Sequence, residues 1–316
     1  MIVRTLLSSL VLIASAQVAA KDKPGKKAAA TPPGKSVTLK QGEVGRWPGI
    51  AAKQCAIDGK SYPAVDAVCY YPIDIEAKPG RHQITVRDQD GKQHKGVAIV
   101  EAVDWPEVKI ELPNDTYVNI SPDNERRAAK ERTTVLALFK GKPGEPRFSL
   151  PLGAPASPLT RNEDDFGSQR TFNEKVASHH TGRDYPVPVG APVKAVAEGK
   201  VVLAEEQFLL GKCVFVDHGD GLISMNFHFS EISVKVGDEV KRGQELGKVG
   251  ATGRASGPHL HLGIRWMGSR IDPQPLLDSP LQLHEVGDKP IEEEKKEERT
   301  AEPKESTQSI RRDEEG

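Results

Sequence analysis

Net charge, aromatic side chains and cysteine are all scarce in this 316-residue sequence. The 44 basic and 45 acidic residues leave a formal charge of -1, so no strong field would concentrate nucleic acid or an anionic membrane surface. Aromatic residues make up only 5% of the chain, and no apolar run beyond the first twenty residues is long enough to span a bilayer. These absences exclude nucleic-acid binding as a default function and predict no integral membrane segment after signal cleavage.

The first twenty residues have the layout of a secretory signal peptide. A positive charge at Arg4 precedes a mostly apolar run from Leu6 to Ala16, and small residues follow up to Ala20. This run is shorter than the ~20 apolar residues that a membrane anchor needs. We therefore expect cleavage after Ala20, a flexible linker over residues 21–35, and a mature protein that is periplasmic or secreted.

The three cysteines fit an exported protein. Cys55 and Cys69 lie on either side of a predicted hairpin, and an oxidising compartment allows them to pair. Such a disulfide would clamp a β-ribbon. Cys213 lies in the apolar run KCVFVDH, so we expect a small buried hydrophobic residue there rather than a reactive thiol.

Short β-type runs separated by turn signals dominate two regions of the chain, which predicts an all-β fold. The first region, 36–112, has the strand spacing of a small β-sandwich. The second lies within residues 161–281. We expect the intervening residues 113–160 to form a linker with a short helix, and residues 282–316 to form a charged, disordered tail.

Histidines in the second β-region recur at spacings typical of metal ligands. Alternate residues of a strand share a face, so His259 and His261 point into the same space, as would His180 and Asp184. Neutral imidazole and carboxylate are good Zn²⁺ ligands, and a catalytic zinc has three protein ligands and a water. His180, Asp184 and one histidine of the second pair make such a set. A zinc site is therefore one explanation of the spacing.

Each of these patterns also has a simpler explanation. A lone HxH on a strand is more often the polar face of a sheet, and an isolated HxxxD is a weaker signal still. His218 lies in the turn DHGDG, where a histidine needs no chemical role. His179 adjoins His180 and would face the other way on a strand, so we expect it to be exposed. Spacing alone does not decide between the two explanations.

Four segments follow one another along the chain in an order that resembles a known family: FGSQRTFN, HTGRD, PVGAPVKAVAEGKVV and VDHGDGLISMNFHFSEISVKVGDEVKRGQELGKVGATGRASGPHLHLGIR. The region from about Phe166 to Pro275, over a third of the chain, resembles the LytM/lysostaphin-type murein metalloendopeptidases. The resemblance implies an antiparallel β peptidase domain, similar to the duplicated hybrid motif, with a zinc groove walled by loops. It also implies that the substrates are peptide bonds of peptidoglycan.

The resemblance further implies a role for five residues. Zn²⁺ would be held by His180, Asp184 and His261, with His228 and His259 unligated beside it as catalytic residues. A metal of this kind lowers the pKa of its bound water towards ~7 and polarises the scissile carbonyl. One free imidazole would take the water proton, and the other would stabilise the oxyanion or protonate the leaving amine. Which histidine has which role stays open.

The chain departs from the family pattern at two positions, and its first β-region resembles a second domain found in some members. The family commonly has an aromatic residue where this chain has Asn226, and a Gly-Asn pair where it has Gly211-Lys212. Both positions are expected to shape the groove and hence substrate preference. Residues 36–112 resemble, more weakly, the immunoglobulin-like domain that precedes the peptidase in some exported bacterial members. That domain would act as a spacer or as a binding module.

Two other functions compete with a zinc endopeptidase. Some domains of this fold have lost their zinc residues and act as non-catalytic regulators or binding modules for other cell-wall hydrolases, but the intact five-residue set argues against this. The segment VKVGDEVKRGQELGKVG resembles hairpins of lipoyl and biotinyl carrier domains, which the export signal and HTGRD disfavour. Protein partners cannot be inferred. The bond that is cut stays open between a D-Ala to diaminopimelate cross-link, a stem bond and a glycine bridge.

Overall fold

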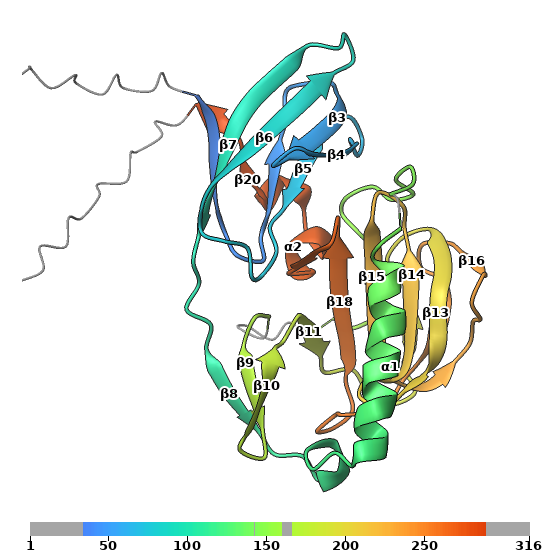
Figure 1. Ribbon diagram of the computed structural model, residues 1–316. Coiled ribbons are helices and arrows are strands. Elements are labelled where there is room, and N and C mark those ends of the chain that lie inside the picture. Colours follow the sequence, from blue (N-terminus) through green and yellow to red (C-terminus); the bar gives the residue numbers. More distant parts are fainter. Residues whose placement is uncertain (1–33, 142, 160–165, 289–316) are drawn as a thin grey trace, which may run out of the picture. The chain divides into compact units, whose positions relative to one another are not determined.

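The computed structural model describes residues 34–141, 143–159 and 166–288, and strands predominate among them (Figure 1). The predicted all-β fold class is therefore confirmed. The predicted signal peptide at 1–20 and nearly all of the predicted linker at 21–35 lie outside the described residues. None of the described helices has the length and apolarity needed to cross a lipid bilayer.

The N-terminal β-region forms two sheets. One has the strand order β21-β1-β7-β6-β3-β4 and the other the order β20-β2-β5. Residues with period-two spacing, such as Val37 and Leu39 on β1 and Ile84 and Val86 on β6, are buried in a shared apolar core. The immunoglobulin-like assignment stays a prediction. The bounds are β1 Lys35–Lys40, β2 Val44–Trp47, β3 Ala52–Ile57, β4 Lys60–Pro63, β5 Cys69–Pro72, β6 Gly80–Asp88, β7 Gln93–Glu101, β20 His284–Glu285 and β21 Gly287–Asp288.

The end of the described chain returns to these two sheets. β20 pairs with β2, and β21 pairs with β1. Leu283 and Val286, which flank these short strands, are buried. The prediction of a disordered tail over 282–316 is thus wrong for residues 284–288, because strands of two residues give no periodic signal in a sequence. It is also wrong for Gln282, which ends η2 (Pro280–Gln282), and for the buried Leu283, whereas residues 289–316 lie outside the described residues.

The disulfide pairs the predicted cysteines, Cys55 and Cys69. Its position differs from the prediction. Cys55 lies on β3 in the larger sheet, whereas Cys69 lies on β5 in the smaller one, because the turn between Val65 and Val68 carries the chain across. The bond therefore links the two sheets instead of clamping one hairpin.

Removing this disulfide should destabilise the N-terminal sheets. The bond closes a loop with a sequence separation of 14, and a loop of this length restricts the unfolded chain by about 3 kcal/mol. We expect a double Cys55→Ala/Cys69→Ala variant to lose about that much free energy of unfolding, measured by denaturant titration. The buried thiol Cys213→Ala is the control, with a loss of about 1 kcal/mol. Two free thiols at Cys55 and Cys69 in exported wild-type protein, detected by mass spectrometry, would contradict the prediction.

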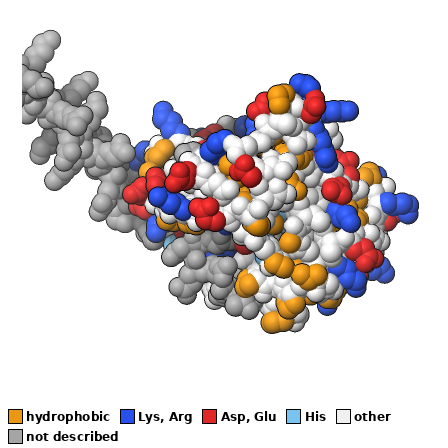
Figure 2. Space-filling model, turned by 90° about the horizontal axis from the view of Figure 1, so that it is seen from below, with side chains coloured by type: hydrophobic (Ala, Val, Ile, Leu, Met, Phe, Trp, Pro, Cys, Tyr) orange, Lys and Arg blue, Asp and Glu red, His pale blue; other side chains and the backbone are white. Residues whose placement is uncertain are grey.

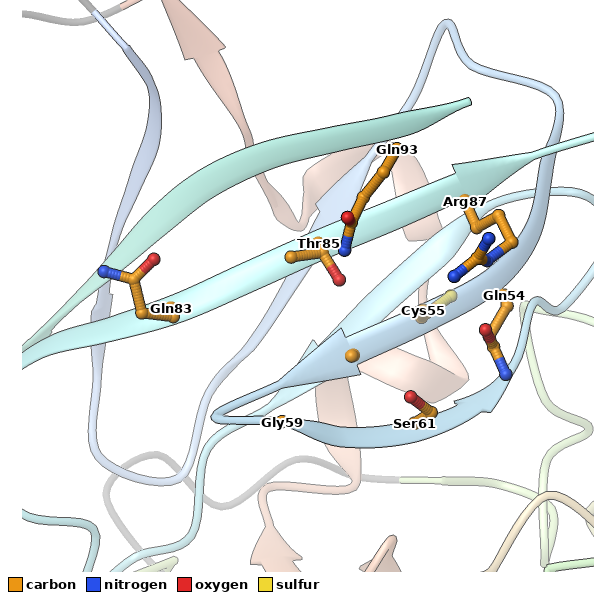
Figure 3. A pocket seen from close by; sticks show the side chains of 9 residues that line it. Gln54, Cys55, Gly59, Ser61, Gln83, Thr85, Arg87 and Gln93 are labelled. Carbon is orange, nitrogen blue, oxygen red and sulfur yellow. The ribbon is translucent and has the colours of Figure 1, made fainter. Parts of the chain in front are cut away.

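The outer face of the larger N-terminal sheet is polar. Figure 3 shows Gln54, Gln83, Thr85 and Arg87 from β3 and β6 around a shallow pocket on this face. They share the face because they are alternate residues on neighbouring strands, with Gln54 paired to Arg87. No histidine or carboxylate lines the pocket. It is therefore not a candidate metal site.

The region predicted as a linker has more structure than expected. It contains η1 (Asp115–Tyr117) and α1 (Pro122–Leu138), which begins after the N-cap Ser121 and has 17 residues. The helix is longer than the short one expected, and it lies beside β13 (Gly199–Gln207; Figure 1), where Glu131 accepts a hydrogen bond from the backbone of Phe208. Further on, Phe148 and Leu152 are buried in the core of the second β-region.

The second β-region forms a nine-stranded sheet whose central order is β11-β18-β15-β14-β13-β16. Alternating apolar residues such as Val214 and Val216 on β14 face a core that includes Trp266. A separate sheet, β10-β9-β8, pairs β8 with β9 in parallel, so β8 belongs to neither N-terminal sheet although it lies within 36–112.

The bounds in these sheets are β8 Glu107–Ile110, β9 Gln169–Phe172, β10 Lys175–His179, β11 Gly182–Tyr185, β12 Pro192–Lys194, β13 Gly199–Gln207, β14 Gly211–Asp217, β15 Leu222–Ile232, β16 Glu239–Val240, β17 Glu245–Val249, β18 Leu260–Trp266 and β19 Ser269–Ile271, followed by α2 Gln274–Leu277 and η2 Pro280–Gln282.

Candidate metal centre

Three neighbouring strands bring the predicted site residues together. Asp184 on β11 lies opposite His261 on β18, and His261 lies opposite Phe227 on β15, one residue before His228. His180 precedes β11 and is not part of it. The expectation that His180 and Asp184 share one strand is therefore wrong, although the turn between β10 and β11 brings both side chains to the same place.

The potential ligand atoms converge on one point. Nε2 of His180 lies 2.9 Å from Nδ1 of His261 and 3.2 Å from Oδ1 of Asp184, and Asp184 Oδ1 lies 2.8 Å from His261 Nδ1. Donor atoms around a tetrahedral zinc lie about 3.3 Å apart, and two imidazoles with a carboxylate are a common zinc donor set. The three residues thus fit a zinc ion by chemistry and by spacing. They form a group that could hold a metal within the described part of the chain.

Gly182, the central residue of HTGRD, keeps space for this convergence. A Cβ atom at this position would lie 2.6 Å from Nε2 of His261 and 2.6 Å from the carbonyl oxygen of Leu262. Any larger residue would displace either the His261 ring or β18. The sequence motif contained this glycine, but its role follows only from the pairing of β11 with β18.

The electrostatics favour ligands that are ready to bind a cation. Burial raises the pKa of Asp184, but hydrogen bonds from His180 and His261 outweigh this and hold it well below its usual range. Burial lowers the pKa of His261 to about 4, although Asp184 opposes the shift. At neutral pH the cluster therefore offers an ionised carboxylate and a neutral His261 imidazole, the states that metal binding requires.

His228 and His259 face the same space with matched hydrogen bonds. Nδ1 of His228 lies 2.8 Å from the carbonyl oxygen of Thr252, and Nδ1 of His259 lies 2.8 Å from that of Gly257. A carbonyl can only accept, so each Nδ1 carries a proton, and the neutral ring of His228 has an unprotonated Nε2. Nε2 of His259 is buried and 3.5 Å from Asp184 Oδ1.

His228 adopts a rare backbone conformation. Its φ is +67°, in the left-handed region that non-glycine residues seldom occupy, and it lies within β15 next to irregular pairing. Burial, followed by the neighbouring His259 and His261, lowers its pKa to about 3. The strand is thus irregular at the point where a neutral imidazole faces the three candidate metal ligands.

Two adjoining cavities flank the cluster. One is bordered by Asp184 and His259 and the other by His180 and His261, and His228 borders both. Three further residues also border both cavities, and none of them was predicted as a site residue: Arg170, Phe172 and Arg254. The first two lie in the segment FGSQRTFN and the third in GATGRASGPHLHLGIR, so the motifs contained them without indicating a role.

Arg170 contacts the candidate ligand carboxylate directly. Its Nη1 lies 2.8 Å from Oδ2 of Asp184. The contact engages the carboxylate oxygen that does not face the two histidines, so it fixes the direction of Oδ1. The strand β9 therefore contributes to the site from outside the nine-stranded sheet.

The other residues singled out from the sequence are not part of the cluster, although His179 borders the cavity next to His180 and His261. His218 is buried between the Glu198 carbonyl and the Ser224 hydroxyl, and burial lowers its pKa to about 4. His179 is only partly exposed, since its Nδ1 bonds to the Gly167 carbonyl, so the expectation of a solvent-exposed residue is wrong. Cys213 is fully buried, as predicted, and burial raises the pKa of its thiol.

The two departures from the family pattern do not border the cavities. Asn226 is buried within β15, and its amide donates to the Val214 carbonyl. Gly211 lies against Thr252, where a Cβ would be 2.3 Å from a carbonyl oxygen, and the backbone of Lys212 donates to the Thr252 hydroxyl. These positions therefore contact residues outside the lining of the groove, and the expectation that they shape its wall is wrong.

Comparisons with known proteins agree with this geometry. The family model of peptidase family M23 matches residues 178–273. A stretch of 87 residues is 40% identical to the peptidoglycan DD-endopeptidase ShyA of Vibrio cholerae, covering 28% of this chain and 20% of that protein. Another of 94 residues is 38% identical to the DD-carboxypeptidase/endopeptidase Mpg of Neisseria meningitidis, covering 30% and 22%. The chain thus spans about a fifth of the length of these curated relatives.

A solved structure extends the similarity beyond the site. A peptidase M23 from Pseudomonas aeruginosa is 30% identical and superposes with a TM-score of 0.57. The alignment covers 78% of this chain and 96% of that chain, so it includes regions outside the matched family model. With nearly the whole of a relative aligned at this identity, the chain belongs to peptidase family M23.

Proposed function

We propose that this chain is an exported zinc metalloendopeptidase that hydrolyses peptide bonds of bacterial peptidoglycan. The observation that carries the proposal is the convergence of His180, Asp184 and His261, whose ligand atoms lie within 4.8 Å of one another. The names of the curated relatives support peptidoglycan as the substrate, since those proteins are a peptidoglycan DD-endopeptidase and a DD-carboxypeptidase/endopeptidase.

In this proposal His180, Asp184 and His261 hold the metal, and His228 and His259 transfer protons. A zinc ion with these ligands supplies Lewis acidity, which lowers the pKa of a bound water to about 7 and polarises a carbonyl. The Nε2 atoms of His228 and His259 stay available for proton transfer, because both Nδ1 atoms donate to backbone carbonyls. One would take the proton of the attacking water, and the other, once its Nε2 carries a proton, would stabilise the oxyanion or protonate the leaving amine.

The rest of the chain supports an exported enzyme. A disulfide between Cys55 and Cys69 forms in oxidising compartments, which agrees with a signal peptide at 1–20. Acidic and basic side chains are interspersed over the face shown in Figure 2, as expected for a protein that does not bind a polyanion. In this proposal the peptidase domain comprises residues 161–281, and it follows an immunoglobulin-like domain at 36–112 in the sequence.

Hydrolysis of purified peptidoglycan by the full chain tests the proposal. We expect release of peptide-containing fragments, identified by mass spectrometry, that stops with a zinc chelator and returns when zinc is added back. The fragment masses also name the bond. If protein that holds one zinc per chain releases nothing, the proposal fails, and the alternative of a non-catalytic regulator of other cell-wall hydrolases takes its place.

A further inference from the structure

Arg254 is a largely buried cation in the groove. It lies in the loop between β17 and β18, and its guanidinium carbon is 4.4 Å from the centre of the Phe172 ring. Like His228, it borders both cavities that flank the three candidate metal ligands. Among the described residues, no carboxylate forms an ion pair or a hydrogen bond with the Arg254 side chain. Its charge is therefore available to a ligand in the groove.

The surroundings of Arg254 favour an anion. Burial, followed by the positive charge of Arg170, lowers the pKa of Arg254, although a guanidinium stays protonated at neutral pH. Asp184 is the nearby acid, and its two oxygens already face Arg170 and the two histidines. The Phe172 ring holds the guanidinium plane in place through a cation–π contact. A bound anion would thus meet a cation that is oriented in advance and that has no competing acid among the residues that the structure describes.

The position of Arg254 restricts which anion it meets. In a peptide, the carboxyl group of the residue on the carbonyl side is consumed in the bond that is cut. A free α-carboxylate next to that bond can therefore belong only to the residue that carries the leaving amine. Guanidinium groups pair with carboxylates through two parallel hydrogen bonds, which fixes both distance and orientation.

We infer that Arg254 binds the free α-carboxylate of the substrate residue on the amine side of the cleaved bond. This inference rests on the proposed peptidoglycan hydrolysis and narrows it. A cross-link from D-Ala to diaminopimelate presents such a carboxylate on the carbon that bears the acylated amine. A bond within a glycine bridge does not, because the next carboxyl group continues the chain. Arg254 is thus a specificity-determining residue that favours the first of these bonds.

Two matched substrates test this role. They are cross-linked muropeptide dimers that differ only in a carboxylate or a carboxamide beside the D-Ala to diaminopimelate bond. We expect zinc-loaded wild-type chain to cleave the carboxylate dimer with a kcat/KM about 10- to 100-fold higher, the factor that a charge-assisted hydrogen bond provides. Arg254→Met should remove this preference by slowing the carboxylate dimer alone, and Arg254→Lys should keep part of it.

Arg265→Met is the matched control. The Arg265 guanidinium also stacks on a phenylalanine, with its carbon 4.2 Å from the Phe139 ring, but it borders neither cavity. This variant should keep the wild-type ratio between the two substrates. Zinc content is measured for every variant.

Four results would overturn the inference. Equal cleavage of both dimers by wild-type chain means that no carboxylate is recognised. An equal loss on both dimers in Arg254→Met, or no loss on either, means that Arg254 acts structurally or not at all. Failure of wild-type chain to cleave any peptidoglycan bond instead removes the proposed function, and the inference with it.

Discussion

Replacing His261 with alanine is expected to remove the bound metal and to lower hydrolysis by more than about 1,000-fold. His261 Nδ1 lies 2.8 Å from Asp184 Oδ1 and 2.9 Å from His180 Nε2, so its loss takes one of three ligand atoms from the cluster. Two remaining ligands are too few for a stable zinc site. The measurements are zinc per chain by atomic emission and fragment release from peptidoglycan.

His94→Ala is the control for the His261 variant. Nε2 of His94 lies 2.8 Å from Asp88 on the N-terminal sheets, so the variant removes a histidine–aspartate contact of the same kind away from the cluster. Zinc content and hydrolysis should both stay at the wild-type level. A His261→Ala chain with full zinc content and full hydrolysis would refute the proposed site.

The candidate site shows what periodicity can and cannot predict. His259 and His261 were expected to share a face because they are two residues apart near a strand, and both do face Asp184. His180 reaches the same place through a turn, so it lies near Asp184 for a different reason than the shared strand from which the spacing predicts it. Local patterns predict a face, but only the fold determines which faces meet.

Arg170, Phe172 and Arg254 were missed for the same reason. Nothing in FGSQRTFN predicts that β9 pairs with β8 from a segment about 60 residues earlier and borders the groove. The contact between Phe172 and Arg254 likewise joins strand β9 to the loop between β17 and β18, which is far away in the sequence. Side chains that are supplied across long sequence separations carry no periodic signal, and these are the residues that line the groove beside the histidines.

Pairing across sheets also explains the errors in the N-terminal region. Cys55 and Cys69 are close enough in sequence to suggest a hairpin clamp, yet the chain changes sheets between them. The buried Leu283 and Val286 sit in a segment with a high density of charge, which composition alone assigns to a disordered tail. The cysteine pair was predictable, but the sheet that each cysteine belongs to and the two short strands after residue 283 were not, because both depend on pairing between distant segments.

Replacing His228 with asparagine should separate catalysis from metal binding. Asparagine tolerates positive φ better than most residues, so it can adopt the +67° of this position, and its amide can donate to the Thr252 carbonyl as Nδ1 does. An amide cannot accept a proton as an imidazole Nε2 can. We expect hydrolysis to fall by about 100- to 10,000-fold while zinc content and thermal stability stay near the wild-type values.

The comparison with His228→Ala makes this prediction specific. Alanine tolerates this φ less well than histidine or asparagine and leaves the Thr252 carbonyl without its donor, so its loss of activity would mix catalysis with stability. Asparagine avoids both effects. If His228→Asn kept wild-type hydrolysis, proton transfer would have to belong to His259 alone, whose Nε2 is the other buried acceptor beside Asp184. If it instead lost its zinc, His228 would support the metal, and the division between ligands and proton-transfer residues would be wrong.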